Sequence, residues 1–208
     1  MGLFPDARVV VLEEPIDVER LAPVSANRSS DLPFIVWTGH VTSMADLKES
    51  AEILNRVHAK HPFKLRIISG PDKPRLDVSF SWEWFPFNGP KEAEYLSGAA
   101  AGLAPLEDGV YSRCKGGYKV KTYLAAGIPV VASPVGHHCH LIRSGENGIL
   151  ADKPEKWEAA LVKLLKEPAY AKHLGEAGRD SAKKRFSHEV LIPRWASELK
   201  ETFPSLRS

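Results

Sequence analysis

Short apolar runs alternate along this chain with longer segments in which apolar residues recur every three or four positions. The short runs are rich in β-branched and aromatic residues and end at glycine, proline or polar turns, which is typical of strands. One of them, IPVVAS, is apolar almost throughout, as expected for a strand buried on both faces. These runs predict strands at 8–12, 34–39, 64–69, 80–85, 102–106, 128–133 and 148–151.

The longer segments have the spacing of amphipathic helices, with apolar side chains gathered on one face. Thr42 or Ser43 suits the N-cap of the first of these helices, and Gly127 suits the position just after the third. The predicted helices lie at 43–60, 91–100, 118–126, 155–166, 169–185 and 188–203.

The alternation of strands and helices predicts an α/β fold. We expect a single three-layer Rossmann-like domain over residues 1–208, with a parallel sheet of about six strands and additional C-terminal helices. Residues 1–33 would supply a first strand and an exposed connection. We expect Pro193 to interrupt the last helix, and Trp195 and Leu199 to face inward.

Composition and charge narrow the classes of function. The chain has 208 residues, of which 43% are hydrophobic and 26% charged, as in ordinary globular proteins. A net charge of +2 is too small to indicate nucleic acid as the main partner. Cys114 and Cys139 are expected to be free thiols in a reducing compartment. Because we find no signal peptide and no long apolar run, we expect a cytoplasmic protein, with peripheral contact at the inner membrane face left open.

The carboxyl ends of parallel strands form the edge at which such sheets bind ligands. At this edge the loop 106–117 leads into a helix whose first free amides are those of about 116–120. These amides and the helix dipole favour an anion, and two glycines allow close approach of the backbone. Arg113, Lys115 and Lys119 add positive charge. We therefore predict a phosphate site, with a solvated basic loop as an equal alternative on these residues alone.

Other motifs point away from several common chemistries. The patterns G-x-x-x-x-G-K-[ST] and G-x-G-x-x-G are absent, which argues against a P-loop ATPase and a standard nicotinamide or flavin dehydrogenase. The run His-His-Cys-His at 137–140 lacks a second ligand group at metal-site spacing, so we expect a polar loop and no metal. Trp82 and Trp84 share one face of a predicted strand and are expected to pack in the core.

Several segments, taken in order, carry a family resemblance. They are GLAPL at 102–106, KGGYKVKTYLAAGIPVVASPVG at 115–136, SGENGILA at 144–151, WEAALVKLL at 157–165 and LGEAGR at 174–179. Together they resemble the C-terminal, donor-binding domain of the retaining glycosyltransferases called group 1 or family 4, which have the two-domain GT-B fold. The resemblance covers nearly the whole chain, although the first half fits more loosely.

The resemblance implies a nucleotide-diphosphate sugar as the substrate, no cofactor or metal, and transfer that keeps the anomeric configuration. Lys115 and Lys119 would neutralise phosphate oxygens, and together with Asp108 they are the candidate catalytic residues. Asp108 and Gly109 would lie near the donor hexose, and residues 85–88 would border the base. The predicted substrate-binding residues are Gly39, His40, Thr42, Ser43, Phe85, Phe87, Asp108, Gly109, Arg113, Lys115, Gly116, Gly117, Lys119 and Thr122.

The chain departs from the family pattern in three ways. Cys114 and Thr122 stand where the family often has two glutamates, the second of which normally binds the ribose hydroxyls. Gly39 and His40 replace a Gly-Arg turn, with Ala45 near the position of a family lysine. The family's acceptor-binding domain has no counterpart in the sequence.

We therefore expect the donor half of a glycosyltransferase of polysaccharide or glycoconjugate biosynthesis, with little activity as this chain alone. Its partners would be a nucleotide sugar and an acceptor domain or subunit, which the terminal helix at 187–208 would face. Two alternatives stay open. One is a non-catalytic nucleotide- or nucleotide-sugar-binding module, and the other is an interaction subunit of a two-chain glycosyltransferase.

Overall fold

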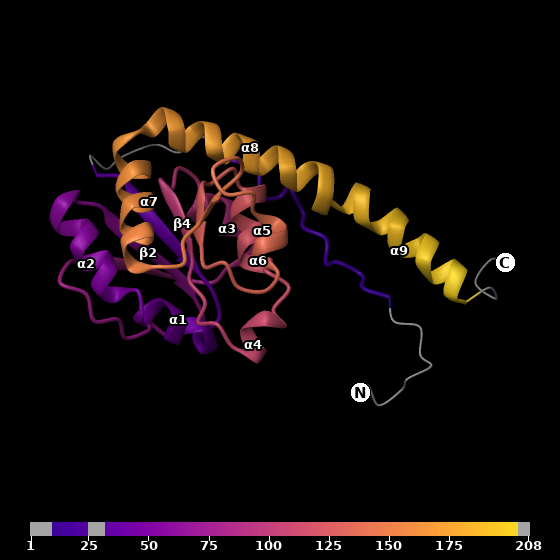
Figure 1. Cartoon of the computed structure of the whole chain (residues 1–208), viewed down its shortest axis with the longest axis horizontal. Coiled ribbons are helices and arrows are strands. Elements are labelled where there is room, and N and C mark those ends of the chain that lie inside the picture. The colour runs from indigo at the N-terminus through magenta and orange to yellow at the C-terminus, as the bar shows by residue number, and fades with distance from the viewer. Residues whose placement is uncertain (1–9, 25–31, 204–208) are drawn as a thin grey trace.

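A computed structural model describes residues 10–24 and 32–203. Within these ranges, six strands form one parallel sheet in the order β3-β2-β1-β4-β5-β6 (Figure 1). This confirms the predicted Rossmann-like fold and its number of strands. The strands are β1 (Phe34–Thr38), β2 (Lys64–Ser69), β3 (Trp82–Pro86), β4 (Ala101–Ala104), β5 (Val130–Ala132) and β6 (Ile149–Leu150).

The strand order reverses between β1 and β4. From β1 the chain builds outward through β2 to β3, and then returns to place β4, β5 and β6 on the other side. In open parallel sheets this reversal leaves a crevice beyond the carboxyl ends of the two central strands. The ends of β1 and β4 therefore mark the expected ligand site.

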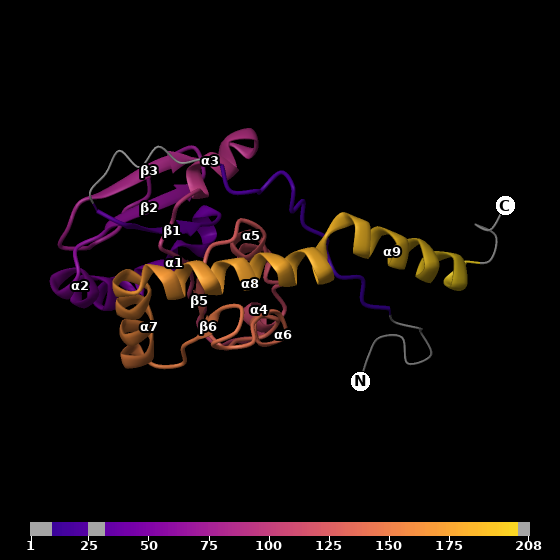
Figure 2. The same cartoon turned by 90° about the horizontal axis from the view of Figure 1, so that it is seen from above.

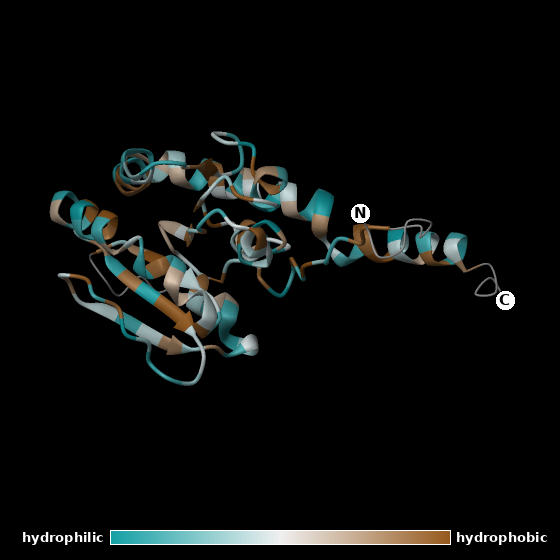
Figure 3. Cartoon of the chain, turned by 60° about the horizontal axis from the view of Figure 1, so that its bottom comes forward, coloured by the Kyte–Doolittle hydropathy of each residue, from teal (hydrophilic) through white to brown (hydrophobic). Residues whose placement is uncertain are grey.

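Helices cover both faces of the sheet, and alternate residues of each strand pack against opposite layers. Ile35 and Trp37 of β1 belong to the core beneath α2 and α7, whereas Val36 belongs to the core beneath α5 and α8. In Figure 3, brown hydrophobic segments of the strands alternate with teal or pale ones, and the helices are mixed in colour. The helices are η1 (Val41–Ser43), α1 (Met44–Lys48), α2 (Ala51–Lys60), η2 (Gly89–Lys91), α3 (Glu92–Leu96), α4 (Val110–Arg113), α5 (Tyr118–Ala125), α6 (His138–Leu141), α7 (Pro154–Lys166), α8 (Pro168–Phe186) and α9 (His188–Thr202).

The predicted strand at 8–12 is wrong for its described part. Residues 8 and 9 lie outside the described ranges, and residues 10–12 form no strand, with the Val11 side chain 88% exposed. β-Branched residues favour a strand, but a strand also needs a partner for its backbone groups. This segment instead runs beside α8 and α9 (Figure 2), where the Ile16 amide donates to the Phe186 carbonyl at 2.8 Å.

The predicted interruption of the last helix at Pro193 is also wrong, because α9 continues through it. Pro193 removes the amide that would bond to the Glu189 carbonyl, and at this exposed position water can take its place. Trp195 is half-buried, but Leu199 is 41% exposed and does not face inward. The cause is visible in Figures 1 and 2, in which α9 extends past the sheet.

Three local predictions have mixed outcomes. The predicted helix at 43–60 is split into α1 and α2, and Ser50 Oγ donates to the Asp46 carbonyl at 3.4 Å near the break. Gly127 follows α5 with a φ of +68°, which confirms its predicted place. Trp82 and Trp84 pack against the core beneath α2 and α7, as predicted.

Candidate functional site

A cavity of about 360 Å³ opens at the carboxyl ends of β1 and β4, where the strand order reverses. The turn after β1 forms one wall, and the loop after β4 with the first turn of α5 forms the other. A wider groove of about 550 Å³, beside Lys48, Arg75 and Trp82, has none of the predicted site residues in its described lining. The cavity is lined by His40, Thr42, Ser43, Asp46, Ala104, Pro105, Leu106, Tyr111, Lys115, Gly116, Gly117, Tyr118, Lys119 and His138.

The first turn of α5 presents its backbone to this cavity. Gly117 is the N-cap with a φ of +70°, and in the described residues no side-chain hydrogen bond caps the turn. A Cβ at Gly117 would lie 2.5 Å from Leu141 Cδ1, so both the conformation and the space favour glycine. The first amides of the helix therefore remain available to an anion.

Lys119 lies between the end of β1 and the cavity. Its Nζ is 4.2 Å from the centroid of the Trp37 ring, and a Cβ at Gly39 would come within 3.3 Å of it. The same Cβ would lie 2.8 Å from the Trp37 ring, so Gly39 leaves room chiefly for that ring and also for the ammonium group. Burial lowers the pKa of Lys119 to about 7, although the Asp46 carboxylate acts in the opposite direction.

Lys115 forms an ion pair inside the cavity with a residue of α1. Its Nζ lies 3.3 Å from Asp46 Oδ2, and both side chains are largely covered. The Tyr111 ring lies on another side of Lys115, with its centroid 5.0 Å from Nζ. A carboxylate thus holds one of the two cations that line the cavity.

His40 and His138 also line the cavity. His138 Nδ1 donates to the Ser133 carbonyl at 3.0 Å, which leaves a lone pair on Nε2. Burial lowers the pKa of His138 to about 4, so its ring is neutral at pH 7. His40 caps η1, because its ring accepts from the Thr42 amide. Ser43 occupies the N-cap position of α1, as predicted, although in the described structure its side chain makes no capping bond.

The family model described as "Glycosyl transferases group 1" matches residues 29–167, which is more than half of the sequence. This chain belongs to the group 1 glycosyltransferases. A search of curated proteins finds no match.

Solved structures share the fold of this glycosyltransferase chain. Sucrose-phosphate synthase from Thermosynechococcus elongatus is 20% identical, with a TM-score of 0.72 over 93% of this chain and 52% of that one. Anabaena Alr3699/HepE, solved with UDP and glucose, is 10% identical, with a TM-score of 0.71 over 90% and 55%. The C-terminal domain of the group 1 protein LpcC from Francisella tularensis is 16% identical, with a TM-score of 0.66 over 83% and 99%. The chain therefore spans about half of the first two proteins and nearly all of the separate LpcC domain.

Other predicted site residues of the glycosyltransferase chain lie on the rim or beyond it. Arg113 forms a bidentate ion pair with Asp108, at 2.6 and 2.8 Å, and Gly109 is the N-cap of α4. The hydrogen bond from Arg113 lowers the pKa of Asp108. These three residues lie outside the lining of the cavity. Asp108 and Arg113 thus pair their charges with one another at the surface.

The remaining predicted contacts are not brought to the cavity. Thr122 is buried within α5 and, in this conformation, closed to a ligand. Phe85 is half-buried against Tyr95, with ring centroids 4.8 Å apart, and Phe87 is exposed. The structure therefore gives no support to a ribose contact at Thr122 or to a base contact at Phe85.

Sequence reasoning missed several residues that line the cavity, chiefly Asp46, Tyr111, Tyr118 and His138. Asp46 lies in the first turn of α1, directly beyond the predicted phosphate-side turn, which is a signal that could have indicated it.

Within residues 10–24 and 32–203, no group of three His, Cys, Asp or Glu side chains could hold a metal ion. The same ranges contain no helix with the length and apolar character needed to cross a bilayer.

Proposed function

We propose that this glycosyltransferase chain binds the nucleotide-diphosphate sugar donor, with the diphosphate in the cavity at the start of α5. The observation that carries the proposal is the convergence of uncapped α5 amides, Lys115 and Lys119 on one cavity. A helix N-terminus and ammonium groups each favour phosphate, and here they share one space. Family membership supports a sugar nucleotide as the source of that phosphate.

The same groups would serve the chemistry. When the bond from the anomeric carbon to the diphosphate breaks, negative charge builds up on the leaving phosphate oxygens. In the proposed donor position, the α5 amides and the two lysines would face that charge, which would favour the transition state over the ground state. In this proposal the protein's own cations, rather than a resident cofactor, offset the charge, and the transfer retains the anomeric configuration.

The donor sugar would lie toward the rim of the cavity. His138 is neutral and offers its Nε2 lone pair to a sugar hydroxyl, while Asp108 is the proposed neighbour of the hexose. Asp108 is engaged by Arg113 in this conformation, so contact with the sugar would require the loop 106–113 to rearrange.

An acceptor-binding domain or subunit would complete the active site. Ile192, Leu199 and Phe203 are exposed apolar residues on or just after α9, at spacings of seven and four that place them on one side. We assign this side to the acceptor partner, because exposed apolar patches commonly mark interfaces. The chain alone should then bind the donor but transfer little sugar.

The test is calorimetric titration of UDP, GDP and ADP into the wild type, Lys115→Ala and Lys119→Ala at low and high salt. Each substitution should weaken binding of the preferred nucleotide about tenfold, with the larger loss at low salt. Lys64→Ala is the matched control, because this exposed lysine begins β2 at the opposite edge of the sheet. Unchanged affinity in both cavity variants would show that the phosphate binds elsewhere.

A second candidate function is a nucleotide-binding module without catalysis. It is favoured by the burial of Thr122, which leaves the proposed ribose contact unmade, and by the carboxylate of Asp46 in the cavity, which would repel the donor phosphates. Combining the chain with its acceptor partner and assaying sugar transfer separates the two functions. Nucleotide binding without any transfer by the complete assembly would favour the module.

A further inference from the structure

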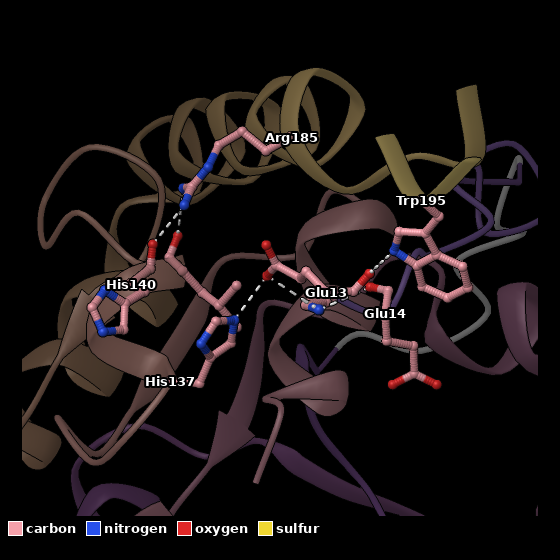
Figure 4. Close-up of polar contacts among 8 residues, drawn as sticks. Glu13, Glu14, His137, His140, Arg185 and Trp195 are labelled. Carbon is pink, nitrogen blue, oxygen red and sulfur yellow. Dashed lines mark hydrogen bonds and ion pairs between the residues drawn. The ribbon is translucent and has the colours of Figure 1, made fainter. Parts of the chain in front are cut away.

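Four elements meet around the carboxylate of Glu13 (Figure 4). Glu13 Oε1 accepts a hydrogen bond from His137 Nε2 at 2.8 Å and lies 3.3 Å from Lys121 Nζ. The Glu13 carbonyl accepts from Trp195 Nε1 of α9 at 3.0 Å. We call Glu13, Lys121, His137 and Trp195 the Glu13 cluster. It joins the segment 10–16, the α5 helix, the turn before α6, and α9.

The buried cation of the cluster makes Glu13 necessary. Lys121 is 1% exposed, and its Nζ also donates to the Glu14 carbonyl at 2.9 Å. A buried ammonium is costly unless a counter-charge and hydrogen bonds surround it. Burial raises the pKa of Glu13, but His137 and Lys121 together bring it below its ordinary value, so the carboxylate is charged at pH 7.

Two members of the cluster are close in sequence to residues that line the cavity. Lys121 is on α5 two positions after Lys119, and His137 directly precedes His138. The His137 and His138 rings both come within 3.6 Å of the point that a Cβ of Gly117 would occupy. Movement of the turn at 136–138 would therefore change the space above the first turn of α5.

We infer that Glu13 is a positioning residue for the cavity, which it serves through His137 and Lys121 without touching a ligand. Its carboxylate holds the turn at 136–138 and the α5 helix in their present spacing. Since the proposed diphosphate site depends on that spacing, the loss of Glu13 weakens nucleotide binding; this step rests on the proposed function.

The Trp195 bond extends the linkage to α9. Segment 10–16 and α9 lie beside one another and away from the sheet (Figure 1). Coupling between sites is reciprocal, so a nucleotide in the cavity must stabilise the cluster by the amount that the cluster stabilises the nucleotide. Nucleotide binding should therefore slow hydrogen exchange at the Trp195 indole N–H.

The decisive variants are Glu13→Gln and its neighbour Glu14→Gln. Glu14 gives the cluster only its backbone carbonyl, and its side chain is exposed and points away (Figure 4). Glu13→Gln should weaken UDP binding about fivefold and abolish the effect of UDP on Trp195 exchange, while Glu14→Gln behaves as the wild type. Thermal unfolding is measured on each variant, so that loss of fold is recognised separately. Equal UDP affinities for the two variants would overturn the inference.

A ligand-free measurement distinguishes this inference from the proposed function. In ¹H–¹⁵N spectra, Glu13→Gln should shift the amide signals of Gly117 and Lys119, and Glu14→Gln should leave them in place. If the wild type binds none of UDP, GDP and ADP, the proposed function fails, and these signals alone decide the positioning role. If Glu13→Gln does not fold, His137→Leu replaces it, because that variant keeps the Glu13–Lys121 pair. Unmoved Gly117 and Lys119 signals in the folded variant contradict the role.

Discussion

Asp46 Oδ2 lies 3.3 Å from Lys115 Nζ inside the cavity at the carboxyl ends of β1 and β4. The two residues come from opposite walls of the cavity and are 69 positions apart in the chain. A carboxylate in this place competes with a phosphate for the same ammonium group. In the proposed diphosphate site, it would also repel the phosphate directly.

Asp46→Asn should therefore tighten the binding of UDP, by about three- to tenfold. The substitution keeps the shape of the side chain and frees Lys115 from its ion pair. Asp152→Asn is the matched control, since Asp152 also pairs with a lysine, Lys156, but at an exposed position on another part of the fold. Calorimetric titration measures both variants. Weaker binding by Asp46→Asn would mean that Asp46 holds Lys115 in place for the ligand rather than competing with it.

The sheet could be predicted because its signals are local. Strands such as β1, β2 and β5 are short apolar runs between turns, and their burial follows from composition alone. The sequence signals for the start of α5 and for Gly127 after its end were equally local. The strand order, and with it the switch point between β1 and β4, was not predicted, because it depends on how strands far apart in the sequence pair with one another.

The site was less predictable because its members meet across the fold. The place of Asp46 just after the phosphate-side turn indicates the cavity, but its contact with Lys115 depends on how two strands are placed side by side. Thr122 was assigned by its alignment with a family glutamate, whereas its burial depends on how α5 packs. The predictions of a strand at Val11 and of an inward-facing Leu199 were wrong for a similar reason. An apolar pattern predicts burial only where another element lies opposite, and both side chains are exposed.

Gly175→Ala should destabilise the fold. A Cβ at Gly175 of α8 would lie 2.2 Å from the carbonyl oxygen of Gly127, so the two backbones would have to separate. In an open helix the same change would stabilise by about 0.5–1 kcal/mol, but here overpacking, at about 1–3 kcal/mol, outweighs it. Urea denaturation should give a net loss of about 1–2 kcal/mol in the free energy of unfolding. Gly70→Ala, where an added Cβ contacts nothing within 4 Å, serves as the control. A Gly175→Ala variant as stable as the wild type would show that α8 can move freely over α5.

Lys119 makes nucleotide binding depend on pH. Its pKa in the free protein is lowered to about 7 because burial disfavours the ammonium form, with Asp46 and Lys115 as the charged groups that act on it. A diphosphate next to the amine favours the protonated form and raises the pKa again. Binding therefore takes up a proton when the pH is above about 7.

We accordingly expect the dissociation constant for UDP-glucose to be flat below pH 7 and to rise above it, approaching about tenfold per pH unit. UDP-glucose suits this test because its diphosphate has no group that titrates near neutrality. Lys119→Arg should make the profile flat up to pH 9, since a guanidinium stays charged throughout that range. Calorimetry in buffers of different ionisation enthalpy counts the protons taken up. A wild-type profile that matches that of Lys119→Arg would mean that Lys119 is already fully charged in the free protein. Burial would then destabilise its ammonium form less than the geometry beside Trp37 and Gly39 implies.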